Sequence, residues 1–167
     1  MASIHLRALE PEDIENMYRW ENDETLWTIS NAHAPFSRHA LTQYIIETQQ
    51  YDIPTSKQLR LVVEADGIAL GCIDLFNIDF FNHRAEVGIL INKDFRNRKY
   101  ATSAIVALCD YAKKNLQMHQ LCAEILTENT ISLHLFEKCG FVHIGTKKDW
   151  CFENGEYKDV EVFQKLL

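Results

Sequence analysis

Residues 91–101 read Ile-Asn-Lys-Asp-Phe-Arg-Asn-Arg-Lys-Tyr-Ala, and they hold four of the chain's 17 basic residues (Lys93, Arg96, Arg98 and Lys99). A helix N-terminus presents unpaired backbone N–H groups and a partial positive charge, and arginines add bidentate donors for phosphate oxygens. The stretch therefore predicts a phosphate-binding turn at the start of a helix. A solvated charged turn that only caps the helix stays open as the alternative.

The sequence on both sides of this turn is regular. An apolar run over residues 85–92, around Gly88, is typical of a central strand. Residues 100–116 are predicted to form a helix, because apolar side chains recur on one face at the 3.6-residue period. The basic turn therefore joins a buried strand to an amphipathic helix.

The rest of the chain alternates between strand and helix patterns. Strands are expected over residues 4–8, 59–65, 68–76 and 121–126, and in a final hairpin of 141–152 with 157–166. Helices are expected after Pro11, over 37–50 with Ser37 as N-cap, and over 130–139 with Gly140 ending the helix. The pattern predicts an α/β fold with one mainly antiparallel sheet and helices on both faces.

The composition fits one cytoplasmic domain, residues 1–167. The first residues show no signal peptide and no apolar run approaches a membrane span, so no membrane is expected as a partner. The net charge of −7 disfavours nucleic acid. Five widely spaced cysteines without a C-x-x-C pair, and histidines without a paired motif, give no support for a disulfide framework or a metal site.

Four blocks of the sequence together resemble the GCN5-related N-acetyltransferase (GNAT) superfamily. The four blocks are IHLRALEPED (4–13), HRAEVGILI (83–91), ENTISLHLFEKCGFVHIG (128–145) and ENGEYKDV (153–160). In addition, Arg96-Asn97-Arg98-Lys99-Tyr100-Ala101 is similar to the family's R/Q-x-x-G-x-G/A signature. The last two blocks are similar to the branch of polyamine (spermidine/spermine) and ribosomal-protein acetyltransferases. The resemblance implies about seven strands, about four helices and a splay between strands four and five.

The resemblance also implies acetyl-CoA as co-substrate and a set of residues that bind it. These residues are Arg96, Asn97, Arg98, Lys99, Tyr100, Ala101 and Thr102 at the pyrophosphate, Ile89, Leu90 and Ile91 along the pantetheine, Asn129 and Phe136. From the residues alone, Asn129 is also a helix N-cap. Lys99 stands where the family has glycine, and a lysine with positive φ there costs about 1 kcal/mol or more.

Phe136 stands where the family has a tyrosine that reprotonates the CoA thiolate. A phenyl ring cannot donate a proton, although it can pack beside the sulfur. Water or a neighbouring group such as His134 or Cys139 then remains as the proton source.

Acetyl transfer to an amine needs a base, because an ammonium group has no lone pair. Glu86, between apolar neighbours at the start of the predicted central strand, is the candidate; the alternative is an ion pair with Arg84 or His83.

The acceptor is expected to be a primary amine, a polyamine or other small cationic amine included. Glu24 and Trp27 are the candidate acceptor-binding residues, because carboxylates and an aromatic ring suit a cation. Acetylation of a protein N-terminus or an antibiotic, and a non-catalytic acyl-CoA-binding module, stay open as alternatives. The resemblance also implies a homodimer as one possible oligomeric state, because members of the family often form dimers.

Overall fold

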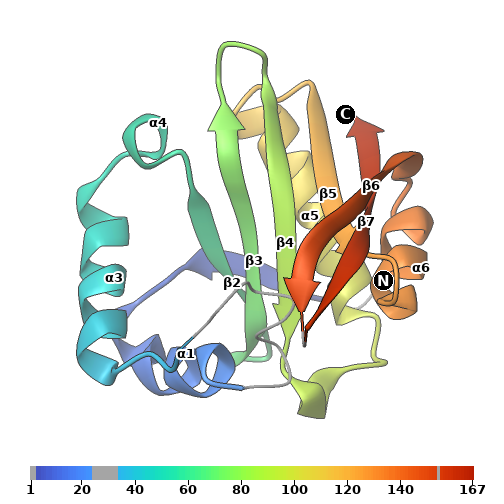
Figure 1. Ribbon diagram of the computed structural model, residues 1–167. Helices are drawn as coiled ribbons and strands as arrows, with labels where there is room; N and C mark the ends of the chain where they lie inside the picture. Colours follow the sequence, from blue (N-terminus) through green and yellow to red (C-terminus); the bar gives the residue numbers. More distant parts are fainter. Residues whose placement is uncertain (1–2, 24–33, 154) are drawn as a thin grey trace.

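A seven-stranded mixed sheet forms the centre of the computed structural model, which describes residues 3–23, 34–153 and 155–167 (Figure 1). The strand order is β1-β2-β3-β4-β5-β7-β6, and β4 with β5 is the parallel pair while the other neighbours are antiparallel. The strands are β1 (His5–Ala8), β2 (Leu59–Ala65), β3 (Ile68–Asp79), β4 (Arg84–Ile91), β5 (Gln120–Leu126), β6 (Val142–Glu153) and β7 (Glu156–Leu166). The predicted α/β class with a mainly antiparallel sheet is confirmed.

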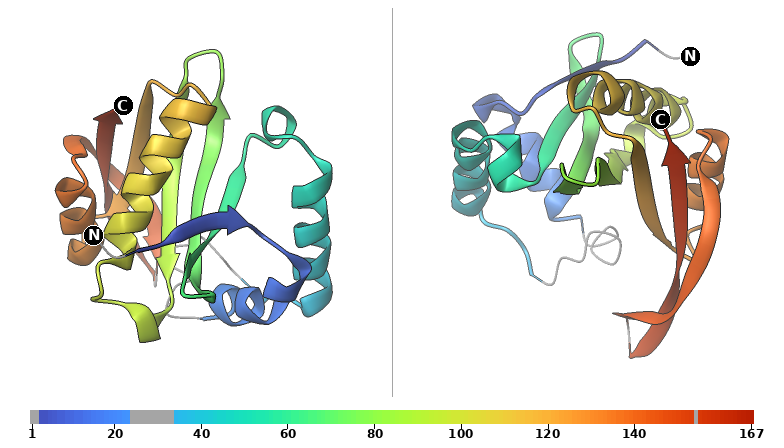
Figure 2. Two further views of the ribbon diagram at one scale, coloured as in Figure 1. Left: turned by 180° about the vertical axis from the view of Figure 1, so that it is seen from behind. Right: turned by 90° about the horizontal axis from the view of Figure 1, so that it is seen from above.

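Helices cover both faces of this sheet (Figure 2). They are α1 (Ile14–Glu21), α3 (Arg38–Gln50), α4 (Ile53–Ser56), α5 (Tyr100–Asn115) and α6 (Thr130–Lys138), with 3-10 turns η1 (Pro11–Asp13) and η3 (Lys93–Phe95). The described part of the chain contains no helix that is both long and apolar enough to cross a membrane.

Local sequence signals explain where several elements begin and end. The Ser37 side chain accepts a hydrogen bond from the backbone N–H of Ala40, so the predicted N-cap of α3 is confirmed. Asp66 and Gly67 both have positive φ, as a two-residue hairpin turn between β2 and β3 requires. Gly140, with φ of 84°, follows the end of α6.

Two hydrophobic cores lie on opposite faces of the sheet. The larger core joins the sheet to α5 and α6 through buried residues such as Ile73, Ile105 and Phe136. The smaller core joins it to α1 and α3 through Met17 and Ile45. Because side chains alternate along a strand, β4 contributes Val87 and Ile91 to the first face, and even-numbered residues face the second.

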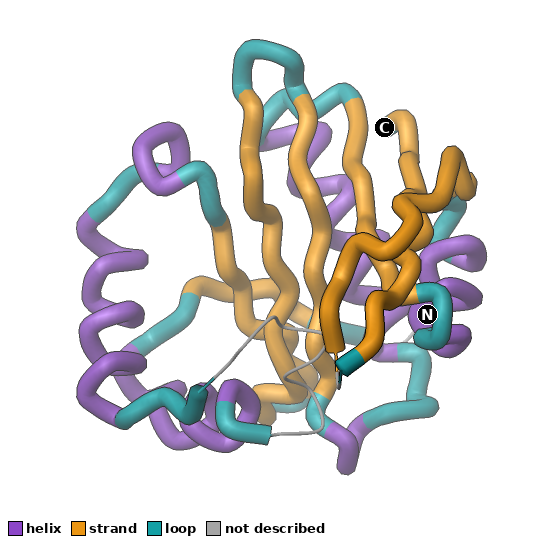
Figure 3. Tube along the Cα trace, in the orientation of Figure 1, coloured by secondary structure: helices purple, strands orange, loops and turns teal. Residues whose placement is uncertain are grey.

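The strands β4 and β5 separate after a short stretch of pairing. Their parallel register covers Arg84 with Gln120, Ala85 with Leu121, and Glu86 with Cys122, and it ends there although both strands continue. Figures 1 and 3 show the two strands diverging from this point. The expected splay between strands four and five is therefore present, and it leaves one edge of β4 open beyond Glu86.

Candidate active site

The turn between β4 and α5 has a tight backbone. It begins with the 3-10 turn η3, continues through Asn97 at φ of 62°, and reaches Lys99 at φ of 65°, directly before α5. Both φ values are in the left-handed region that glycine adopts freely and that costs other L-residues energy. Lys99 therefore takes the backbone conformation that the family's glycine favours.

Arg96 braces this turn against the end of the central strand. Its Nε donates a hydrogen bond to the Ile91 carbonyl oxygen at 2.9 Å. The Arg98 guanidinium lies 6.0 Å from the centroid of the Phe95 ring, while the side chains of Arg98 and Lys99 are exposed. An arginine has five N–H donors, so Arg96 retains donors for a ligand after bonding to Ile91.

The first turn of α5 is suited to an anion. The first backbone hydrogen bond of α5 in the described residues runs from the Ser103 N–H to the Lys99 carbonyl oxygen, at 3.1 Å. The N–H groups of Tyr100, Ala101 and Thr102 have no carbonyl four residues earlier within the helix, and the Lys99 side chain does not cap it among the described residues. With the basic side chains around it, this helix start fits a pyrophosphate group.

Ser103 carries a further polar group near this helix start. Its residue is 5% exposed, and its Oγ is the one buried side-chain polar atom without a hydrogen-bond partner in residues 3–23, 34–153 and 155–167. Such an atom is uncommon in a folded chain.

The open edge of β4 follows directly from the splay. Ile89 and Leu90 are half-buried and pack against the two opposite cores, while Ile91 is buried. Their backbone is paired with β3 on one side and has no partner from β5 on the other within the described chain. This stretch of backbone is free to bind an extended ligand by main-chain hydrogen bonds.

Asn129 and Phe136 lie on α6, beside β5. The Asn129 Oδ1 accepts a hydrogen bond from the Ser132 N–H at 3.2 Å, so its N-cap role is confirmed, while contact with the co-substrate stays a prediction. Phe136 is 3% exposed, and its ring meets Phe141 edge-on with centroids 5.0 Å apart. Phe136 is thus part of the core next to α5.

Glu86 is the last residue of β4 that pairs with β5. Its carboxylate accepts a hydrogen bond from the Asn77 side-chain amide at 3.0 Å. Arg84 forms an ion pair with Asp79, and His83 Nδ1 lies 3.0 Å from the Gln117 carbonyl oxygen. The alternative ion pair of Glu86 with Arg84 or His83 is therefore not formed in the described residues.

Cys122 lies across from Glu86 at the apex of the splay. Burial raises the pKa of the Cys122 thiol, and the neighbouring Glu86 carboxylate raises it further. The thiol is consequently neutral at physiological pH and offers no competing nucleophile beside Glu86.

A half-buried ionic cluster, formed by Arg60, Asp74 and Glu21, supports the face of the sheet that carries α1 and α3. Arg60 donates to Asp74 at 2.7 and 2.9 Å and to Glu21 at 2.6 Å, and these side chains are 17%, 14% and 14% exposed. Although burial alone lowers the pKa of Arg60, the Asp74 charge holds it well above its usual range. The cluster therefore ties the last residue of α1, Glu21, to β2 and β3.

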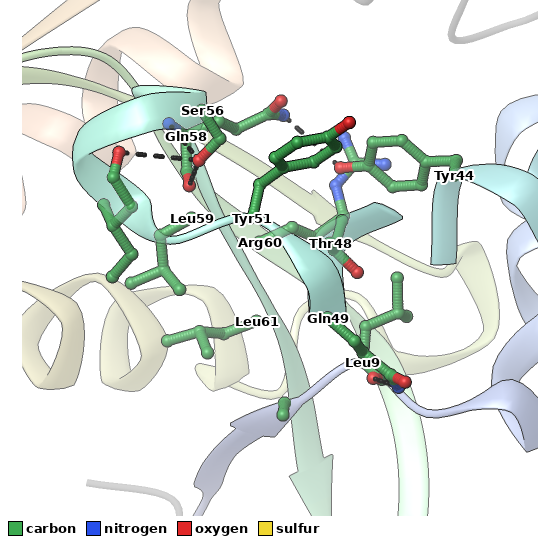
Figure 4. Close-up of a pocket in the computed structure, with 12 residues that line it drawn as sticks. Leu9, Tyr44, Thr48, Gln49, Tyr51, Ser56, Gln58, Leu59, Arg60 and Leu61 are labelled. Atoms are coloured by element: carbon green, nitrogen blue, oxygen red, sulfur yellow. Dashed lines mark hydrogen bonds between the residues drawn. The ribbon is translucent and has the colours of Figure 1, made fainter. Parts of the chain in front are cut away.

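Two hollows lie on this same face. One, of about 270 Å³, is lined by residues of α1, β4 and the basic turn, including Trp20, Leu90 and Arg96. The other, of about 130 Å³, lies between α3, α4 and β2, with Tyr44 and Arg60 in its wall (Figure 4). The first hollow adjoins the predicted site, and the second does not share a residue with it.

The structure brings most of the predicted residues to the two sides of the splay, and two others fall outside the part of the chain that it describes. Glu24 and Trp27 lie outside the described residues. Sequence reasoning missed Asn77 as the partner of Glu86. The available signal was an asparagine at the end of a strand pattern, because asparagine tolerates the positive φ of a strand irregularity. It also missed Arg60, whose partners are distant in sequence.

Comparison with known proteins gives a consistent result. The family model described as "Acetyltransferase (GNAT) domain" matches residues 3–142. Spermidine N(1)-acetyltransferase of Vibrio cholerae is 27% identical over 96% of this chain and 91% of its own. YdaF of Bacillus subtilis, provisionally named a ribosomal N-acetyltransferase, is 29% identical over 98% and 91%.

Solved structures agree with the sequence comparison. The crystal structure of spermidine N-acetyltransferase from Vibrio cholerae in complex with CoA and spermine superposes with a TM-score of 0.88 at 27% identity, covering 98% of this chain and 95% of that one. Fold, splay and sequence therefore place this chain in the GNAT family, as an N-acetyltransferase.

Proposed function

We propose that this N-acetyltransferase transfers the acetyl group of acetyl-CoA to a primary amine of a small polyamine. The observation that carries the proposal is the splay itself: an open β4 edge, with a basic helix start at one end and the Glu86 carboxylate at the other. The relatives that act on spermidine support the acceptor class, and a relative solved with CoA and spermine supports both ligands.

In this proposal the co-substrate is held by two parts of the chain. The N–H groups of Tyr100, Ala101 and Thr102, with Arg96, Asn97, Arg98 and Lys99, bind the pyrophosphate. The backbone of Ile89, Leu90 and Ile91 binds the pantetheine amides, and Asn129 and Phe136 form the opposite wall. Acetyl-CoA, when bound there, supplies a thioester whose acetyl group faces the apex of the splay.

Glu86 acts as the base in this proposal. It takes one proton from the acceptor ammonium, directly or through a water molecule, and so provides the lone pair that attacks the thioester carbon. The C–N bond forms and the C–S bond breaks; the nitrogen then releases its second proton to water, and the CoA thiolate takes a proton from water, because Phe136 has no proton to give.

The acceptor requires charge complementarity. A polyamine is cationic at neutral pH, and the net charge of −7 favours its approach. Glu24 and Trp27 are proposed to bind its distal part through a carboxylate and an aromatic face.

A thiol-release assay with acetyl-CoA tests the proposal. The panel includes spermidine, spermine, butylamine, a peptide with a free N-terminus and an aminoglycoside. We expect kcat/KM to be highest for the polyamines and to fall at least tenfold in Glu86→Gln. Turnover of only the peptide or only the aminoglycoside would show that the acceptor is a protein N-terminus or an antibiotic and not a polyamine. CoA binding without any turnover would indicate a non-catalytic module.

A further inference from the structure

Strand β3 contains an irregularity directly opposite the candidate base. Phe76 pairs with Glu86 on β4, and the next pair in the ladder is Asp79 with Arg84. Two residues of β3, Asn77 and Ile78, thus face one residue of β4. This is the pattern of a β-bulge, a device that redirects a side chain and that occurs often beside active sites.

Asn77 has an unusual backbone conformation in this bulge. Its φ is 49°, in the left-handed region, although it lies inside a strand. The conformation lets Asn77 extend its side chain to Glu86 while Ile78 is buried in the larger core. Strain of this kind persists where the surrounding structure imposes it, and asparagine tolerates it better than most residues.

The hydrogen bond between the two side chains has a defined direction. The Asn77 Nδ2 donates to the Glu86 Oε1 at 3.0 Å. A carboxylate only accepts, so the amide must present its NH₂ group to Glu86. It also restricts the side-chain torsions of Glu86.

We infer that Asn77 is a positioning residue for Glu86: the β3 bulge holds the carboxylate oriented toward the acceptor nitrogen. The inference rests on the proposed function, because it assigns Asn77 a role only if Glu86 is the base. Its consequence is specific, since a residue that orients the base affects kcat and leaves the binding of acetyl-CoA unchanged.

The other charged groups around Glu86 have partners of their own. On β4, Arg84 pairs with Asp79 of β3. On β5, Cys122 is a neutral thiol at neutral pH and Glu124 forms an ion pair with Lys147 of β6. Within the described residues, Asn77 is the hydrogen-bond partner of the Glu86 side chain.

The test compares Asn77→Gly and Asn77→Asp with wild type and with Asp66→Gly. Glycine suits the positive φ of position 77 and removes the amide, so it separates the side chain's role from backbone strain. Asp66, in the β2–β3 hairpin, has a similar φ of 50° and provides the matched backbone control. Thermal unfolding checks that each variant is folded, and kcat and both KM values are measured with spermidine.

We expect Asn77→Gly to lower kcat about three- to tenfold, since it removes one exposed hydrogen bond to a charged group. The KM for acetyl-CoA should stay within about twofold of wild type, and Asn77→Asp should lower kcat further through like-charge repulsion. Asp66→Gly should match wild type.

Asn77 variants with the kcat of wild type would overturn the inference while the proposed function stands. A wild-type enzyme that acetylates no amine would overturn the proposed function, and this inference with it.

Discussion

Lys99 provides a direct test of the backbone at the start of α5. Its φ of 65° places a lysine in the left-handed region at the N-cap of a 16-residue helix. Replacing it with glycine removes the clash between Cβ and the backbone while leaving the turn's shape unchanged. Lys99→Gly should therefore stabilise the protein, even though glycine substitutions are usually destabilising.

The magnitude follows from two opposing contributions. The left-handed conformation costs a non-glycine residue about 1–2 kcal/mol. Glycine loses about 0.5–1 kcal/mol more conformational entropy on folding than alanine does. The net gain lies between about 0 and 1.5 kcal/mol, which for a chain of this size raises the melting temperature by up to about 6 °C.

Thermal unfolding followed by circular dichroism measures the change. Lys99→Ala removes the same charge but keeps the strain, so it should show no such gain. Lys57→Gly is a second control, because Lys57 is exposed, caps the end of α4 and has φ of 53°. This variant should raise the melting temperature of the protein similarly and leave acetyl-CoA affinity unchanged. A lower melting temperature for Lys99→Gly than for Lys99→Ala would refute the backbone reasoning.

Three further outcomes are expected. Arg60→Met should lower the free energy of unfolding in urea by about 3–5 kcal/mol, because it removes the cation that the Glu21 and Asp74 carboxylates share; a loss below about 1 kcal/mol would contradict a stabilising role of this half-buried cluster. Phe136→Tyr should maintain or raise kcat in the thiol-release assay by providing a proton donor for the thiolate, and a large loss would show a pocket built around the phenyl ring. Burial raises the pKa of Cys72 to about 12, so a disulfide reagent at pH 8 should modify it only after unfolding; equal native-state labelling of wild type and Cys72→Ala is the expected result, and fewer labels in the variant would disprove it.

The elements with strong local patterns could be predicted from sequence. The helix α5 has a continuous apolar face, the α3 N-cap is a serine followed by a helical pattern, and Asp66-Gly67 is a standard hairpin turn. In each case neighbouring residues determine the structure, so no knowledge of distant contacts is needed. The basic turn before α5 belongs to this group as well.

Other features depend on contacts that local patterns do not contain. The four-residue helix α4 is too short for a periodic signal. The order β5-β7-β6 and the bulge at Asn77 arise from strand register, which distant partners determine. Arg60 and Glu21 are 39 positions apart, so nothing in their local sequence indicates that they pair.

The most direct test of the central claim is a calorimetric titration of acetyl-CoA into wild type and two charge-matched double variants. Arg96→Ala with Arg98→Ala removes two cations from the proposed pyrophosphate site. Lys113→Ala with Lys114→Ala removes two from the last turn of the same helix. The first pair should raise the Kd about tenfold or more, since each charge-assisted bond contributes about 1.5–3 kcal/mol, while the second stays within about twofold of wild type. An unchanged Kd in the arginine variant, or an equal increase in both, would contradict the assignment of the α5 start as the acetyl-CoA site.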